Sequence, residues 1–155
     1  MTGISAGIAM LVFTLCTTQC SKKNGSSMTT APKMVSLKSN ATLGNYLADQ
    51  NGHTLYFFSN DANGQNNCPG GCAVTWPAFS VSNLTADQLD AGLNLTDFKS
   101  ISITGGGTQM TYKGWPLYRF GADSSVRANT KGITVGGIGT VWPVMVSSIA
   151  PAPHP

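Results

Sequence analysis

The chain has 155 residues and a formal net charge of +3, from nine Lys and Arg against six acidic residues, all of them Asp. Charged residues are only 10% of the chain, against roughly 25% in an average soluble domain, and the one basic pair is Lys22 and Lys23, so we expect no nucleic-acid partner. Glu is absent while Gly, Pro, Ser, Thr and Asn are frequent, which excludes a long helical bundle and favours strands joined by turns.

The N-terminus carries an export signal. Residues 4–15 form an apolar run of the length expected of a signal-peptide core, too short to span a bilayer. Small residues precede Cys20 at two of three positions, whereas the bulky Leu15 precedes Cys16. This stretch resembles the precursors of bacterial lipoproteins, which predicts a signal peptide over 1–19 and lipidation of Cys20. A plain secretory signal is the alternative.

The segment after Cys20 is polar and contains nothing that could form a core, so residues 20–33 are predicted to be a lipidated cysteine and a flexible tether. The tether holds Lys22, Lys23 and Lys33, which account for the whole net charge, because six basic and six acidic residues remain in the body. The Pro-rich residues 150–155 are predicted to be a disordered tail.

The body, predicted as one domain over 34–149, is an internal repeat. Residues 52–61 and 114–123 both read G-x-x-L-Y-x-F-x-x-D, at an offset of 62. Residues 70–77 and 136–143 share a Gly-Gly pair and a Trp-Pro pair at the same spacing. Two matched blocks in one order predict a repeat over 34–81, a linker over 82–97 and a second repeat over 98–146.

Each repeat is predicted to begin as a β-meander of three strands. The strands are expected at 34–39, 44–49 and 54–59, and again at 98–103, 109–112 and 116–120. The fold class is therefore all-β, with two pseudo-symmetric meanders packed as one small sandwich or barrel-like domain and one short helix.

Alternation along the strands places the motif aromatics together. Tyr56 and Phe58 share one face of their strand, as do Tyr118 and Phe120. We expect this face to form the core between the copies, with a ligand platform as the alternative.

The linker contains one helix signal. Thr85 and Gln88 have capping-box spacing, Leu84 and Leu89 occupy the staple positions, and Gly92 follows as a stop. These residues predict a helix of about two turns over 86–91.

The doubled motif, the Cys-Pro-Gly-Gly-Cys-Ala-x-x-Trp-Pro block and the closing Gly-Gly-x-x-x-x-Trp-Pro block resemble one known family. It is that of the predicted bacterial lipoproteins with a Y-x-[FWY]-x-x-D motif, also called the secreted repeat of unknown function. The resemblance covers nearly the whole chain after the tether. It implies an exported, often lipid-anchored, β-rich repeat domain without an established activity.

Cys68 and Cys72 are the first candidates for chemistry. In an oxidising compartment two cysteines separated by Pro-Gly-Gly are expected to form a disulfide. A redox or copper accessory role, with His53 as a third ligand, is the alternative, because thiolates suit Cu(I).

Asp61 and Asp123 recur at one place in both copies, which favours a structural role in which they accept backbone N–H bonds after their strands. A calcium loop lacks its closing acid, since the chain has no Glu, and a carboxylate-pair enzyme is the least favoured alternative. We therefore expect a non-catalytic, lipid-anchored protein of the outer membrane, with no cofactor or metal. Its partner, an envelope protein or a small molecule, is expected at the loops around Trp76, Trp142, Asp61 and Asp123.

Overall fold

The computed structural model describes residues 2–3, 31–123 and 141–155. Cys20, nearly all of the predicted signal peptide and most of the tether therefore lie outside the described residues, as does the loop that follows Asp123.

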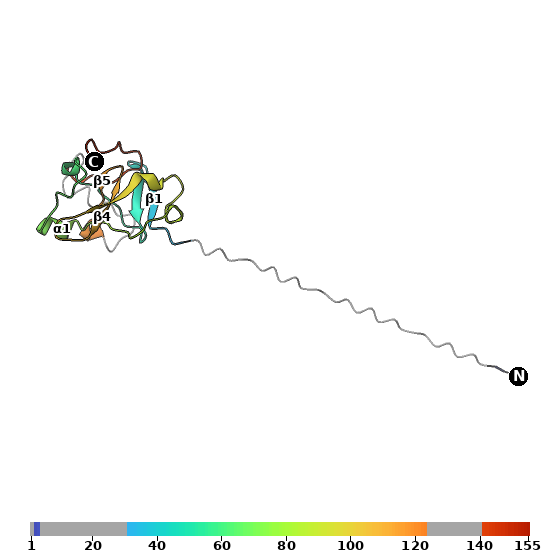
Figure 1. The fold of residues 1–155 in the computed structure, drawn as a ribbon. Helices are drawn as coiled ribbons and strands as arrows, with labels where there is room; N and C mark the ends of the chain where they lie inside the picture. The colour runs from blue at the N-terminus through green and yellow to red at the C-terminus, as the bar shows by residue number, and fades with distance from the viewer. Residues whose placement is uncertain (1, 4–30, 124–140) are drawn as a thin grey trace.

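Short antiparallel strands form two small sheets (Figure 1). The first sheet pairs two strands across a tight turn, and the second is a three-stranded meander. This architecture confirms the all-β class and the two repeats. The strands are β1 (Val35–Asn40) and β2 (Gly44–Asp49) in the first sheet, and β3 (Phe98–Ser102), β4 (Thr108–Tyr112) and β5 (Trp115–Pro116) in the second.

Helical structure in the described residues is limited to single turns. The α-helix α1 covers only Gly71–Thr75, directly before the first Trp-Pro pair. The 3₁₀ turns are η1 (Ser59–Asp61), η2 (Ala86–Gln88), η3 (Leu95–Asp97) and η4 (Gly121–Asp123).

The helix predicted over 86–91 is wrong in length. Its start is as expected, because the Thr85 N–H donates to the Gln88 side chain at 3.1 Å. The turn ends at Gln88, since Leu89 is extended, forms a parallel bridge with Val35 and is only 3% exposed. Burying Leu89 beside β1 outweighs continuing the helix through Asp90 and Ala91 to the Gly92 stop.

The third strand of each meander also differs from the prediction. Only β5 is a regular strand there, and the rest of the predicted third strands has isolated bridges at Thr54, Tyr56 and Tyr118. The reason is that successive residues pair with different neighbours: Leu55 N–H donates to the Leu47 carbonyl, while Tyr56 N–H donates to the Tyr118 carbonyl.

The two repeats meet at a reciprocal backbone pair. Tyr56 N–H donates to the Tyr118 carbonyl and Tyr118 N–H donates to the Tyr56 carbonyl, both at 2.9 Å. The motif tyrosines of the two copies are thus direct antiparallel neighbours. The pseudo-two-fold axis that relates the repeats passes between them.

The repeats also exchange the segments that follow their Trp-Pro pairs. Phe79 of the first repeat donates to the Leu117 carbonyl and accepts from the Met110 N–H of the second, both at 2.8 Å. At the corresponding places Met145 of the second repeat donates to Leu55 and accepts from Leu47, both at 2.9 Å. Each copy therefore completes the strand set of the other.

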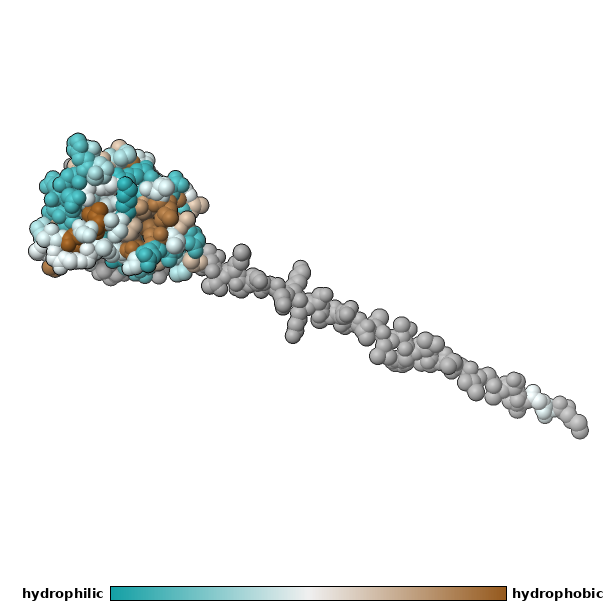
Figure 2. Space-filling view, in the orientation of Figure 1, coloured by the Kyte–Doolittle hydropathy of each residue, from teal (hydrophilic) through white to brown (hydrophobic). Residues whose placement is uncertain are grey.

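Two hydrophobic clusters result, one on each side of the central strands. The larger packs the β-strands and the linker, and the smaller holds most of the motif aromatics. On the face seen in Figure 2, brown apolar atoms occupy limited patches among teal and white ones. The larger cluster contains Val35, Leu47, Leu55, Phe57, Phe79, Val81, Leu89, Phe98, Met110, Tyr112, Leu117 and Met145. The smaller contains Tyr46, Tyr56, Cys68, Trp76, Tyr118, Phe120, Trp142 and Val144.

The structure contradicts the expectation of a disordered tail over 150–155. Ala152 is 4% exposed and its N–H donates to the Lys113 carbonyl at 2.8 Å, while the His154 N–H donates to the Ala62 carbonyl at 3.1 Å. The prediction rested on the backbone N–H groups that proline lacks. It overlooked that the two remaining N–H groups, of Ala152 and His154, both donate to carbonyls of the domain.

Candidate functional site

The motif Tyr and Asp side chains pair between the repeats. The Tyr56 hydroxyl donates to Asp123 Oδ2, and the Tyr118 hydroxyl donates to Asp61 Oδ2 at 2.5 Å. All four residues are at most 1% exposed. Each Tyr of the Y-x-F-x-x-D motif therefore donates a hydrogen bond to the Asp of the other copy.

The turn after each motif strand aims its carboxylate inward. Asp61 closes η1 by donating its N–H to the Phe58 carbonyl, and Asp123 closes η4 in the same way on Phe120. Two residues of 3₁₀ turn between the aromatic and the Asp reverse the chain, so the side chain points back at the core. This geometry explains why the motif needs its fixed spacing.

Asp61 has a second partner in its own loop. Its Oδ1 accepts the N–H of Asn67 at 2.9 Å, which is the turn-stabilising role predicted for it. Burial raises the pKa of Asp61, and the hydrogen bonds from Tyr118 and Asn67 offset part of that rise. Burial and the neighbouring Asp61 raise the pKa of Tyr118 far above its ordinary value, so this phenol stays a proton donor.

Four aromatic rings form a continuous stack across the pseudo-two-fold relation. Trp76 and Trp142 lie parallel with centroids 4.1 Å apart, Phe58 stacks on Trp142 at 4.3 Å, and Phe120 lies against Trp76 at 4.7 Å. Each such pair contributes about 0.5–1.5 kcal/mol beyond the area it buries.

The motif tyrosines close the two sides of this stack. Tyr56 meets Trp76 edge-on at 5.3 Å, and Tyr118 meets Trp142 edge-on at 5.1 Å. Trp76 and Trp142 are 4% and 6% exposed. These side chains form the core between the copies, as expected, and they are too buried to serve as the alternative ligand platform.

Cys68 and Cys72 are joined in a disulfide, with Cα atoms 5.2 Å apart. Cys72 lies within α1, and its carbonyl accepts the Trp76 N–H at 2.8 Å. The place of the disulfide in the structure is therefore to shape the approach to Trp76. No group of three or more His, Cys, Asp or Glu that could hold a metal occurs among the described residues, so His53 does not complete a copper site with the two sulfurs.

An ion pair between the repeats was missed by the sequence analysis. Arg119 Nε donates to Asp49 Oδ2 at 2.7 Å, and Asp49 Oδ1 accepts the N–H groups of Asn51 and His53. The Asp49 side chain is fully buried, and the guanidinium lies 5.0 Å from the Phe79 ring centroid. The sequence holds one signal for this ion pair: Arg119 stands in the second copy where the first copy has the apolar Phe57.

A buried amide was missed as well. Gln109 is 0% exposed, its Nε2 donates to the Leu117 carbonyl at 2.9 Å, and its Oε1 accepts from Asn66 at 2.7 Å. It ties the Asn-rich loop before the disulfide to β4, and no repeat motif marks it.

A polar groove of about 650 Å³ lies where the tether joins the domain. Two lysines and two aspartates line it, although the Asp49 side chain itself is fully buried, and Lys33 also donates to the carbonyls of Asp87 and Leu89. Its lining includes Lys33, Ser36, Lys38, Asp49 and Asp90.

Two interlocked β-repeats with a reciprocal Tyr–Asp core define a class of small repeat domain. The chain belongs to the family described as a secreted repeat of unknown function, whose model matches residues 39–80 and 99–145. The family description indicates an extracellular or envelope location. Comparisons with curated proteins and with solved structures find no match. No helix in the described residues is long and apolar enough to cross a membrane.

Proposed function

We propose that this chain is a lipid-anchored bacterial cell-envelope protein, held at the outer membrane through Cys20, whose β domain is a non-catalytic binding or accessory module. The apolar run over 4–15, the small residues before Cys20 and the polar tether support the anchor. The membership of a secreted family supports export. Two or more acyl chains on Cys20 would hold the protein stably at the bilayer.

The observation that carries the non-catalytic role is the use of the motif in the core. Asp61 and Asp123 are buried, and each accepts a hydrogen bond from a Tyr of the other repeat. A general acid or nucleophile must reach a substrate, and these carboxylates face side chains instead. The Y-x-F-x-x-D motif of both repeats is thus used to lock the repeats together.

The partner is an envelope protein or a small molecule and not a nucleic acid. The body of the chain carries equal numbers of basic and acidic residues, which leaves no electrostatic footprint for a phosphate backbone. The basic residues of the tether lie close to the anchor, where each lysine can add at most about 1 kcal/mol of attraction to anionic lipid.

Labelling with palmitate in a bacterial host tests the anchor. Wild type and Cys16→Ala are expected to take up label and to fractionate with the outer membrane, while Cys20→Ala takes up none. Label retained on Cys20→Ala, or lost from Cys16→Ala, would contradict the assignment.

Single Asp61→Asn and Asp123→Asn variants test the non-catalytic role. Both are expected to lower the melting temperature, because each carboxylate is a core hydrogen-bond acceptor. A variant that keeps the wild-type melting temperature while losing an activity or a bound ligand would show that the carboxylates do chemistry.

A further inference from the structure

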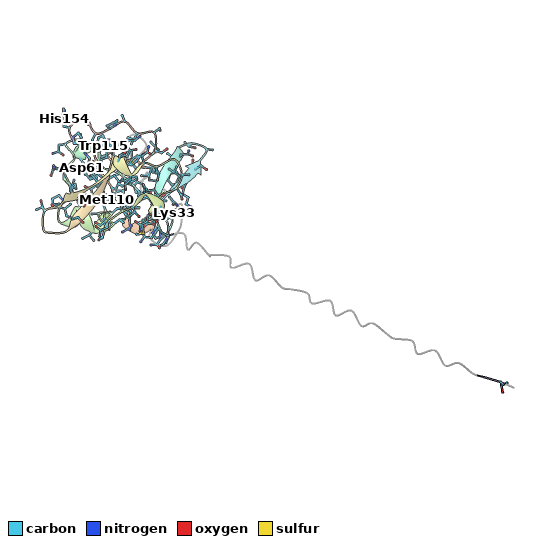
Figure 3. The ribbon with its side chains drawn as sticks, turned by 45° about the vertical axis from the view of Figure 1, so that its right-hand side comes forward. Lys33, Asp61, Met110, Trp115 and His154 are labelled. Atoms are coloured by element: carbon cyan, nitrogen blue, oxygen red, sulfur yellow. A yellow bond between two sulfur atoms is a disulfide. The ribbon has the colours of Figure 1, made fainter. Side chains whose placement is uncertain are left out.

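Residues 150–155 read Ala-Pro-Ala-Pro-His-Pro, with proline at every second position. Proline fixes its own φ and restricts the residue before it to extended conformations, so this segment is extended before it contacts anything. In Figure 1 the red C-terminal trace runs along the edge of the domain, and Figure 3 places His154 and Trp115 at one end and Lys33 away from them.

Main-chain hydrogen bonds hold the segment to the domain. Only Ala152 and His154 have an N–H after Ala150, and both donate, to the carbonyls of Lys113 and Ala62. In the other direction the indole Nε1 of Trp115 donates to the Ala150 carbonyl at 3.0 Å. The domain thus binds the residues between the prolines, Ala152 and His154, through their backbone N–H groups.

The surface under the segment is shaped for proline. A Cβ on Gly114 would lie 2.5 Å from Pro155 Cβ, and one on Gly64 would lie 2.8 Å from Pro155 Cα. Both glycines also have φ above +70°, which other residues rarely adopt. The Trp115 ring is held against Phe57, with centroids 4.9 Å apart. An aromatic ring whose N–H donates to a peptide carbonyl, beside a surface of bare backbone, is the chemistry that recognises extended Pro-rich peptides.

The segment leaves part of this groove unfilled. A hollow of about 270 Å³ lies beside it, bordered by both of its ends, a Lys pair and the open face of β3 and β4. A ligand with larger side chains than Ala would have room there. The lining includes Lys99, Ile101, Thr111, Lys113, Pro151 and Pro155.

We propose that this groove is a peptide-binding site for extended segments with proline at alternate positions, supplied by a partner protein of the envelope, and that residues 150–155 occupy it in cis as a competitor. This inference specifies the proposed binding role. It rests on the proposed function only in taking the partner to be an envelope protein. Failure of peptide binding would leave the palmitate result untouched, so the two can fail separately.

The test uses the full chain and a fluorescent peptide of sequence Ala-Pro-Ala-Pro-His-Pro. A tethered competitor acts at an effective concentration in the millimolar range, so the wild-type chain should bind this peptide weakly. Ala152→Glu places a charge on the buried Ala152 site of the tail and should release it. Anisotropy is then expected to show binding about tenfold tighter or better than wild type.

Two controls accompany this measurement. Trp115→Phe, added to Ala152→Glu, keeps the ring but removes the Nε1 donor and should weaken binding again. A peptide with Glu at the position of Ala152 should not bind. If Ala152→Glu does not keep the wild-type circular dichroism, a chain with Pro151→Gly, Pro153→Gly and Pro155→Gly releases the tail without adding a charge.

A folded, tail-released chain that binds the peptide no better than wild type would overturn the proposal. Equal binding by the Trp115→Phe chain would overturn the assigned groove. A wild-type dimer that Ala152→Glu dissociates would assign the groove to the tail of a second copy and would also overturn it.

Discussion

At the scale of single residues, the packing of the core depends on which Asp carboxylate accepts the hydrogen bond of each motif tyrosine. A buried carboxylate is costly unless it is hydrogen-bonded, and Asp61 has two donors, Tyr118 and the backbone of Asn67. Asp123 accepts from Tyr56 in the same way. The four residues therefore stabilise the fold only as a set, since removing a phenol leaves a buried acceptor short of its partner.

Asp61 gives the stability a distinct pH dependence. Burial raises its pKa, so this carboxyl favours folding fully below the ordinary Asp pKa of about 3.9 and loses that contribution as pH rises through the raised value. Urea unfolding should show that the free energy of unfolding of wild type, relative to that of Asp61→Asn, increases when the pH falls from about 7 to about 4.

Asp87 is the matched control for this measurement. Its hydrogen bond from Thr85 lowers its pKa, so its contribution is present above the ordinary Asp pKa and lost on acidification. The difference between wild type and Asp87→Asn should therefore move the other way. An Asp61→Asn difference that is independent of pH would show that the carboxyl is not perturbed as described.

At the scale of elements, the disulfide and α1 prepare one side of the Trp stack. The loop they close is short, and the aligned positions of the second repeat are Thr134 and Ile138, which cannot form a bridge. We therefore expect the bridge to adjust the position of Trp76 without being a condition for folding.

Removing both sulfurs tests this role. Cys68→Ser with Cys72→Ser is expected to lower the free energy of unfolding by about 2 kcal/mol, because closing so short a loop removes little entropy from the unfolded chain. Thermal unfolding measures the loss, and reduced wild type is the control that should match it. Complete loss of folding, or an unchanged melting temperature, would contradict the assignment.

Sequence alone predicted β1 to β4 well, because the alternation along each strand and the glycine turn at Gly105 are local signals. It failed where a distant partner decides the outcome. The capping box at Thr85 starts a helix correctly, but the bridge of Leu89 to Val35 ends it after one turn. The tail failed for the same reason, since its order depends on the Lys113 and Ala62 carbonyls.

At the scale of the whole molecule, the repeats are reciprocal and not merely adjacent. Phe79 lies between strands of the second repeat and Met145 between strands of the first, so each half carries a strand that belongs to the other. The repeated letters predicted two similar units and a shared core. They could not say whether Tyr56 meets Asp61 or Asp123, because both copies contain the same motif.

Separated halves should therefore not fold. Residues 31–97 and 98–155, made as two chains, are each expected to lack a cooperative unfolding transition, since each is small and misses a central strand. Mixing them should restore a folded 1:1 complex, measured by circular dichroism and sedimentation. A half that unfolds cooperatively by itself would show that the exchange is dispensable.

A double-mutant cycle on the four motif residues tests the reciprocal core most directly. Tyr118→Phe with Asp61→Asn, and Tyr56→Phe with Asp123→Asn, should show coupling free energies of about 0.5–3 kcal/mol in urea unfolding, because these pairs share a hydrogen bond. The pairs within one repeat, Tyr56 with Asp61 and Tyr118 with Asp123, should couple more weakly than either. Stronger coupling within a repeat than between repeats would contradict the interlocked core.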